Sequence, residues 1–203
     1  MLPRVMLCAG GHAGVLISLL DGGVIEVIDD DPWKHGQTIG GVPIGGNVEK
    51  YSPNSVLLIN GLGSVKTMTP RRMIYEKYKA KGYQFGSVIW RYADVSHGEG
   101  AQVLTGAIIQ TGTYIGGNTV INTGAIIDHD CLIGDHCHIA PGVTMSGGVT
   151  VGDSVHVGVG ATIIQGIRIG TGATIGAGAV VVRDVPDGAV VVGVPARVVS
   201  YND

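Results

Sequence analysis

The carboxyl-terminal half of the chain carries an aliphatic residue or Met at every sixth position, without a break, from Val103 to Val181. A second small or β-branched residue lies two positions earlier in each repeat, and Gly, Asn and Asp fill many of the positions between. Two inward positions in every six residues are typical of a hexapeptide parallel β-helix. The two series are Val103, Ile109, Ile115, Ile121, Ile127, Ile133, Ile139, Met145, Val151, Val157, Ile163, Ile169, Ile175, Val181, and Ala107, Thr113, Thr119, Ala125, Cys131, Cys137, Val143, Val149, Val155, Ala161, Ile167, Ala173, Ala179.

This period also predicts which residues are neighbours in space. If each hexapeptide forms one side of a triangular prism, three make a coil of eighteen residues. Residues one coil apart should then stack about 4.8 Å above one another, the spacing of strands in a sheet. On this rule Gly147 stacks on His129, and His156 stacks on His138.

The first ninety residues have a different pattern, in which short apolar runs alternate with amphipathic segments. This order is typical of a small parallel sheet with a ligand crevice at its carboxyl edge. We therefore divide the chain into a Rossmann-like domain, residues 1–92, and a β-helix domain with a terminal tail, residues 93–203. The predicted strands are residues 4–8, 24–28, 56–59 and 88–89, and the predicted helices end at Leu20 and span 70–81.

Two features of the first domain suggest a nucleotide site. Gly10, Gly11 and His12 lie between the first strand and the first helix, where backbone N–H groups can hold a diphosphate. Asp29 and Asp30 end the second strand, where a carboxylate can bind a ribose hydroxyl or a base edge. A plain tight turn and a loop of solvated aspartates are the alternative interpretations.

Composition agrees with a solenoid and excludes some functions. The 203 residues include 35 Gly and one Phe, and the formal charge of −3 offers no basic surface for nucleic acid. The chain begins Met-Leu-Pro-Arg-Val and has no apolar run long enough to cross a membrane, so we expect a cytoplasmic protein. Cys131 and Cys137 fall in the inward series, which favours a core role over a disulfide or a metal site.

One part of the β-helix is rich in polar residues that a structural prism does not need. His129 lies at a predicted corner, two residues after inward Ile127, so its imidazole should point outwards. Asp130 is placed to hold one ring nitrogen, an arrangement that fixes the tautomer and raises basicity. The sequence therefore predicts a general base here, with a solvated surface histidine as the alternative.

Four segments together resemble the PglD/NeuD family of bacterial sugar acyltransferases over essentially the whole chain. They are AGGHAG near residue 10, VIDDD ending near residue 31, INTGAIIDHDCLIGDHCHIAPGVTMSGGVTVG from residue 121, and GVPAR from residue 193. The resemblance implies a Rossmann-like α/β domain followed by a left-handed parallel β-helix, a homotrimer with sites between subunits, and acetyl-CoA as co-substrate. It implies no metal and no membrane or nucleic-acid partner.

The resemblance also implies roles for individual residues. His129 matches the family's general base and Asp130 the neighbour that raises its basicity. The residues matching contacts to acetyl-CoA are His138, Gly147, Val159 and Ala177. Those matching the nucleotide-sugar pocket of the first domain are Gly10, Gly11, His12, Asp29, Asp30 and Gly61, and Asn122 corresponds to a polar residue near the reacting sugar. The chain departs from the family in the first Gly of the early loop and in the segment from Asn60 to Val65, both in the nucleotide pocket.

The expected activity is N-acetylation of the amino group of a nucleotide-linked 4-amino-4,6-dideoxy sugar in surface-glycan synthesis. The amine would attack the thioester directly, with no Cys or Ser nucleophile. Three alternatives remain: O-acetylation of a sialic-acid-type sugar, a β-helix zinc hydratase, and a sugar-nucleotide-binding protein without catalysis. The hydratase family places two of its ligands five residues apart, a spacing that the histidines here do not reproduce.

Overall fold

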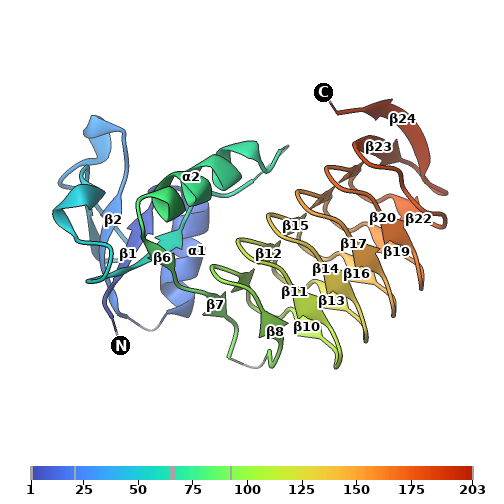
Figure 1. Cartoon of the computed structure of the whole chain (residues 1–203), viewed down its shortest axis with the longest axis horizontal. Helices are drawn as coiled ribbons and strands as arrows, with labels where there is room; N and C mark the ends of the chain where they lie inside the picture. Colours follow the sequence, from blue (N-terminus) through green and yellow to red (C-terminus); the bar gives the residue numbers. More distant parts are fainter. Residues whose placement is uncertain (1, 21, 65–66, 92, 203) are drawn as a thin grey trace. The chain divides into compact units, whose positions relative to one another are not determined.

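The computed structural model describes residues 2–20, 22–64, 67–91 and 93–202 (Figure 1). The chain forms two compact units: the first consists of described residues within 2–64 and 69–88, and the second mainly of those from Ile89 onward. The expected domain boundary, residue 92, lies outside the described residues. In the described part of the chain, neither helix is long and apolar enough to span a lipid bilayer.

The first unit is built on a six-stranded sheet in the order β3-β4-β2-β1-β5-β6. Neighbouring strands are parallel except for the β3–β4 hairpin, which the sequence pattern did not predict. The expected strand at residues 88–89 exists but does not belong to this sheet. The bounds are β1 (Arg4–Leu7), β2 (Val24–Ile28), β3 (Thr38–Ile39), β4 (Val42–Gly45), β5 (Leu57–Asn60) and β6 (Gln84–Phe85).

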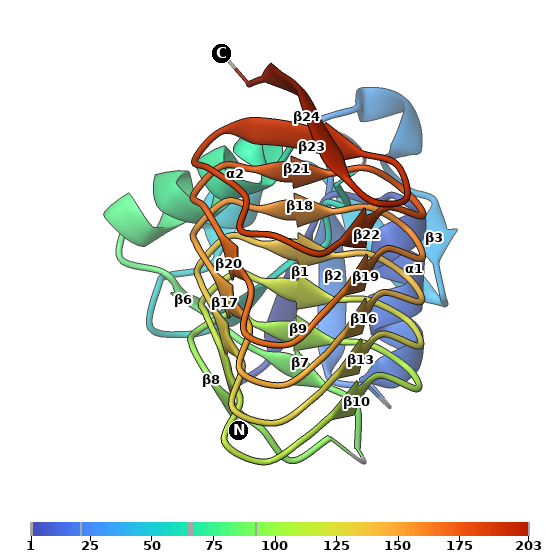
Figure 2. The same ribbon diagram turned by 90° about the vertical axis from the view of Figure 1, so that its right-hand side faces the viewer.

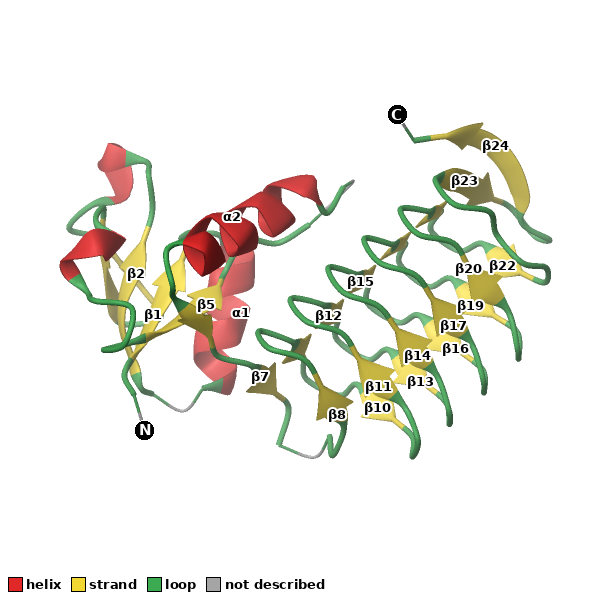
Figure 3. Ribbon diagram, in the orientation of Figure 1, coloured by secondary structure: helices red, strands yellow, loops and turns green. Residues whose placement is uncertain are grey.

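Two α-helices and two short 3-10 helices complete this unit (Figure 3). They are α1 (Gly11–Leu19), α2 (Thr69–Ala80), η1 (Pro32–Lys34) and η2 (Val48–Lys50). Both predicted α-helices are confirmed to within about a residue, because Gly10 precedes the first and Pro70 occupies the first turn of the second. The strand order reverses beside β1, with β2 on one side and β5 on the other, so the crevice expected in such sheets lies at the carboxyl ends of these strands.

The second unit is a parallel β-helix with three sides, which Figure 2 shows from its end. The β13 sheet contains β10 (Ile108–Ile109), β13 (Ile126–Ile127), β16 (Thr144–Met145), β19 (Thr162–Ile163) and β22 (Val180–Val181). The β14 sheet contains β8 (Ser96–His97), β11 (Tyr114–Ile115), β14 (Leu132–Ile133), β17 (Thr150–Val151) and β20 (Arg168–Ile169). The β15 sheet contains β7 (Val88–Ile89), β9 (Gln102–Val103), β12 (Val120–Ile121), β15 (His138–Ile139), β18 (His156–Val157), β21 (Thr174–Ile175), β23 (Ala189–Val192) and β24 (Arg197–Tyr201).

The predicted eighteen-residue stacking is confirmed from β8 to β22, whereas the last pairing, of Thr174 with Val190, spans sixteen residues. Ile127 pairs with Met145, and His138 with His156, each one coil apart. Both inward series are buried, apart from Ile109, which packs against the core while partly exposed. Each coil therefore extends continuous ladders of aliphatic side chains, and the corners are left free to carry other residues.

The repeat begins one step earlier than the sequence pattern indicates. Ser96 and His97 form β8 and pair with Tyr114 and Ile115, so His97 occupies an inward position of the backbone. Its side chain is exposed because no coil precedes it in the β14 sheet. The aliphatic series misses this strand because its inward residue is polar.

Candidate functional site

His129 stands on the corner between the β13 and β14 sheets. Its side chain is 58% exposed, which confirms the predicted outward direction. The backbone on either side is fixed by the coil below, because the Thr113 hydroxyl donates to the Asp128 carbonyl (2.9 Å) and accepts from the Cys131 N–H (3.1 Å). The Gly148 N–H, in the coil above, donates to the His129 carbonyl at 2.9 Å. The corner is thus held from both directions while the imidazole remains accessible.

Asp130 fixes the proton on the His129 ring. Its Oδ2 lies 2.8 Å from Nδ1, and a carboxylate can only accept, so Nδ1 carries the hydrogen and the Nε2 lone pair is left for a proton. This hydrogen bond, reinforced by the negative charge of Asp128, raises the pKa of His129 above its ordinary value of 6.5. This arrangement is typical of a general-base histidine that is oriented by a carboxylate.

Asp130 also has an unusual backbone conformation. Its φ is +58°, and the corresponding residues of the coils below and above are Gly112 and Gly148, with φ of +76° and +69°. Asp is among the few residues that tolerate this left-handed region. The corner therefore presents a carboxylate where its two neighbours have no side chain.

Gly147 lies beside the free nitrogen. A Cβ added to Gly147 would be 2.7 Å from both Cε1 and Nε2 of His129, closer than real Cβ contacts. The φ of Gly147 lies outside the left-handed region, so its backbone would accept other residues. The His129 ring leaves no room for a side chain at this position. The predicted stacking of Gly147 on His129 is confirmed.

Asn122, His138 and His156 lie on another side of the prism, in the β15 sheet and at its edge. The Asn122 Oδ1 accepts from the Thr123 N–H (2.8 Å), which leaves its Nδ2 to donate to His138 Nε2 at 3.1 Å. His138 is 7% exposed, and its ring meets that of His156 edge to face, with centroids 5.1 Å apart. Burial lowers the pKa of His156, which favours its neutral form.

The remaining residues predicted to contact acetyl-CoA stand on the corner that follows the β15 sheet. The Gly178 N–H donates to the Val159 carbonyl at 2.9 Å, so Val159 and Ala177 are in adjacent coils as expected. Both are exposed. Within one chain, therefore, the structure brings His129, Asp130 and Gly147 together. His138 lies on a different side of the prism, in the β15 sheet, and Val159 and Ala177 lie on the corner after that sheet.

The residues predicted for the nucleotide pocket in the first domain gather at the carboxyl ends of β1, β2 and β5. Gly10 caps α1, and Gly11 and His12 form its first turn. Gly61 follows β5, and a Cβ there would meet the Leu7 carbonyl oxygen at 2.5 Å, so the strand ends pack closely only because this residue is glycine. Cys8, which with Ala9 stands where a first Gly was expected, adopts a φ of +71°, the conformation that glycine takes most easily.

The structure separates the two aspartates that the sequence left equivalent. Asp29 accepts from the Ala9 N–H (2.6 Å) and the Asp31 N–H (3.0 Å) and pairs with Lys34 Nζ (3.0 Å). Desolvation opposes these interactions, but together they lower the pKa of Asp29. Asp30 is exposed, and no hydrogen bond or ion pair to its carboxylate is found among the described residues. Asp29 holds the ends of β1 and β2 together, and Asp30 is available to a ligand.

Substituting the two aspartates should therefore have different effects. Asp30→Ala should weaken nucleotide-sugar binding while leaving the melting temperature and acetyl-CoA binding close to wild type. Asp29→Ala should lower the free energy of unfolding by about 1 kcal/mol, because the part-buried Ala9 N–H loses its acceptor and Lys34 loses its ion pair. Calorimetry and thermal unfolding of both variants check this; equal losses of stability would contradict the division of roles.

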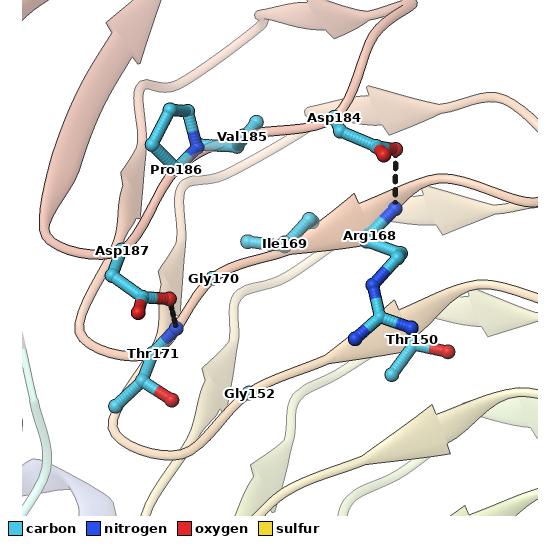
Figure 4. Close-up of a pocket in the computed structure, with 10 residues that line it drawn as sticks. All are labelled: Thr150, Gly152, Arg168, Ile169, Gly170, Thr171, Asp184, Val185, Pro186 and Asp187. Carbon is cyan, nitrogen blue, oxygen red and sulfur yellow. Dashed lines mark hydrogen bonds between the residues drawn. The ribbon is translucent and has the colours of Figure 1, made fainter.

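A hollow at the end of the β14 sheet was not predicted (Figure 4). It forms where the chain leaves the repeat after Val181 and a shorter segment closes the last coil. Asp184 and Asp187 each accept from a backbone N–H of β20 or the turn after it, those of Arg168 and Thr171, both at 2.8 Å. The Asp184 carboxylate thus replaces the backbone acceptor that a further strand would supply to Arg168. Asp187 repeats a contact of the regular coils, in which Asp135 and Asp153 accept from the N–H groups of Gly117 and Asp135. In the described residues no group of three His, Cys, Asp or Glu side chains is placed to hold a metal ion.

Comparisons with known proteins agree with this architecture. Residues 112–147 match the family described as bacterial transferase hexapeptide (six repeats). Perosamine N-acetyltransferase from Caulobacter crescentus, solved as a point mutant with CoA and GDP-perosamine, is 34% identical, with 98% of this chain and 97% of that chain covered and a TM-score of 0.87. The acetyltransferase domain of PglB from Neisseria gonorrhoeae, solved with acetyl coenzyme A, is 32% identical, with 97% and 98% covered and a TM-score of 0.87. No curated protein sequence matches the chain.

Proposed function

The chain belongs to the hexapeptide-repeat acyltransferases, in the group that resembles PglD, and we propose that it is an acetyl-CoA-dependent N-acetyltransferase of a nucleotide-linked amino sugar. Relatives more than 30% identical over nearly the whole chain hold CoA with GDP-perosamine, or acetyl coenzyme A. The acceptor we propose is the amino group of a 4-amino-4,6-dideoxy sugar used in surface-glycan synthesis.

The observation that carries this proposal is the His129 imidazole, whose tautomer is set by Asp130 and whose Nε2 lies beside Gly147, a residue with no side chain to cover it. In the proposed reaction the sugar amine attacks the thioester carbonyl, and the C–S bond breaks as the amide forms. His129 Nε2 takes the proton from the amine, and Asp130 stabilises the resulting imidazolium. The CoA thiolate leaves and is protonated, and the Gly147 N–H supports the developing oxyanion.

The proposed site needs more than one chain. His129 and Gly147 are on the corner between the β13 and β14 sheets, whereas the other three residues we propose for acetyl-CoA belong to the β15 sheet and the corner after it: His138, Val159 and Ala177. Apolar side chains beside His129 are exposed in the single chain: Ile108, Tyr114, Ile126 and Leu132 are 41–53% exposed. A second copy covering this surface would bring its β15 side to His129, and we propose a homotrimer with sites between subunits.

The proposal is tested by measuring CoA thiol release with acetyl-CoA and a panel of UDP-, GDP- and dTDP-linked 4-amino-4,6-dideoxy sugars. Turnover that yields an N-acetylated sugar nucleotide, identified by mass spectrometry, would support it. Acetylation only of sugar hydroxyls, or binding of sugar nucleotides without thiol release, would show that the assignment is wrong.

The Asp130→Asn variant should change the pH dependence of this reaction. Since the base must be neutral, activity is lost as pH falls through the raised pKa of His129. Asn tolerates the positive φ of this position but removes the charge, so the half-activity pH should move down towards 6.5 while the maximal rate falls. Profiles of kcat/KM against pH for both proteins provide the measurement, and an unchanged midpoint would mean that Asp130 does not tune the base.

A further inference from the structure

Trp33 is the most exposed large apolar side chain among the described residues. It is 88% exposed and lies in η1, directly after the carboxyl end of β2. Trp is the side chain with the most apolar surface to gain from contact, and it is seldom left uncovered without a partner. The other tryptophan of the chain, Trp90, is only partly exposed.

The backbone that carries Trp33 is fixed on both sides. Asp31 Oδ1 accepts from the Trp33 N–H (3.0 Å), and the Gln37 side-chain amide donates to the Trp33 carbonyl (2.6 Å). The side chains of the next two residues contact Asp29, at the carboxyl end of β2. Lys34 Nζ pairs with Asp29 Oδ2 (3.0 Å), and His35 Nε2 lies 2.8 Å from the Asp29 carbonyl oxygen. The turn therefore holds the indole in the solvent, and its exposure is not a result of a loose loop.

The surroundings of this turn indicate what would cover the indole. Asp30, three residues earlier, has an exposed carboxylate, an acceptor-only group suited to ribose hydroxyls or base N–H groups. Asp30 also lines a small hollow at the ends of β1 and β2, together with Leu7, Cys8, Ile28, Ile74, Lys77 and Tyr78. One strand away, Gly10 and Gly11 begin α1, where backbone N–H groups suit a diphosphate. A diphosphate at the end of β1 would place its nucleoside at the end of β2.

We propose that Trp33 is the platform on which the base of the nucleotide sugar stacks, with Asp30 accepting hydrogen bonds from the same nucleoside. This inference rests on the proposed function and names a binding residue for its substrate. Stacking on an aromatic face tolerates any base, since every base has a π-face, but overlap is greater for a purine. The platform therefore predicts tighter binding of GDP than of UDP or dTDP.

The test uses the full chain and the indole itself as reporter. In a Trp90→Phe background Trp33 is the remaining tryptophan, and its fluorescence should be quenched as GDP is added. Trp33→Ala should weaken GDP binding, measured by calorimetry, by roughly 5- to 150-fold, the range for one stacked base. Trp33→Phe should recover much of the affinity, and acetyl-CoA binding should match wild type in both variants.

The outcomes separate this inference from the proposed function. If wild-type protein binds GDP, UDP or dTDP but Trp33→Ala binds them equally well and Trp33 fluorescence is unchanged, the platform is wrong and the acetyltransferase proposal stands. If wild-type protein binds no nucleoside diphosphate, both are wrong. If Trp33→Ala changes the sedimentation of the protein and leaves nucleotide affinity unchanged, the indole belongs to a contact between copies, and the platform is again wrong.

Discussion

Replacing His129 by Ala should lower kcat by roughly 10²- to 10⁴-fold, the range for losing a positioned general base. The imidazole is 58% exposed, and its backbone is held by Thr113 below and Gly148 above, so the substitution removes no core packing. The melting temperature and the affinity for acetyl-CoA should therefore stay close to wild type. Steady-state kinetics together with thermal unfolding provide the measurement, and wild-type turnover would refute the mechanism.

A mixing experiment tests the proposal that each site is shared between two chains. His129→Ala and His138→Ala should each be impaired alone, because each lacks one part of every site. When the two variants are unfolded and refolded together, mixed assemblies should contain some sites with both histidines and regain part of the activity. If mixing restores nothing, the two histidines act within the same chain or do not act together.

The Gly147→Ala variant should lose at least about 10²-fold in kcat, the cost of misplacing a reacting group by around 1 Å. The added Cβ would lie 2.7 Å from Cε1 and Nε2 of His129 and 3.2 Å from Cδ2, so the ring must move away. The displaced group is an exposed side chain, and the φ of Gly147 suits Ala, so folding should be retained. Kinetics and unfolding of the same preparation give the test.

Gly117 offers a matched control for this variant. It occupies the equivalent position on another corner, and a Cβ there would be 3.2 Å from the Glu99 carbonyl oxygen and 3.6 Å from Asp135 Oδ1. These contacts are tight but leave His129 untouched, so Gly117→Ala should remain active. Gly152 would be a poor control, because its Cβ would meet the Thr171 backbone N at 2.7 Å. Normal acetylation by Gly147→Ala would show that His129 is not beside the reacting atoms.

The β-helix could be predicted because its buried apolar residues recur at a fixed spacing along the chain. An uninterrupted six-residue repeat fixes which side chains point inwards and which residues stack, and so the contact of His129 with Gly147 follows from counting. The six-residue pattern did not reveal the strand at Ser96–His97, because its inward position, at the open end of the β-helix, is occupied by the polar residue His97. Hydrophobic periodicity detects a strand only where there is a core for it to face.

The first domain was less predictable because its sheet is irregular. The β3–β4 hairpin consists of a strand of two residues and a strand of four on either side of Gly40 and Gly41, with no long alternating run to reveal it. Asp29 and Asp30 have the same side chain, so the sequence does not distinguish their roles. The fold shows that the Asp29 carboxylate accepts from the Ala9 N–H and pairs with Lys34. Likewise, the sequence names Trp33 without showing that its indole is exposed beside the strand ends.

If the proposed site joins His129 of one chain to His138 of another, the placement of the two residues on different sides of one prism restricts how copies of the chain can associate. An interface that joins the His129 corner of one chain to the β15 side of another uses two unlike surfaces, so it is heterologous. Such interfaces either close into a ring or continue into a filament, and a two-fold dimer cannot use them. In a closed ring the His129 corner of every subunit contacts the β15 side of a neighbour, so the number of complete sites equals the number of subunits. An open pair would have one complete site and one unmatched half at each end.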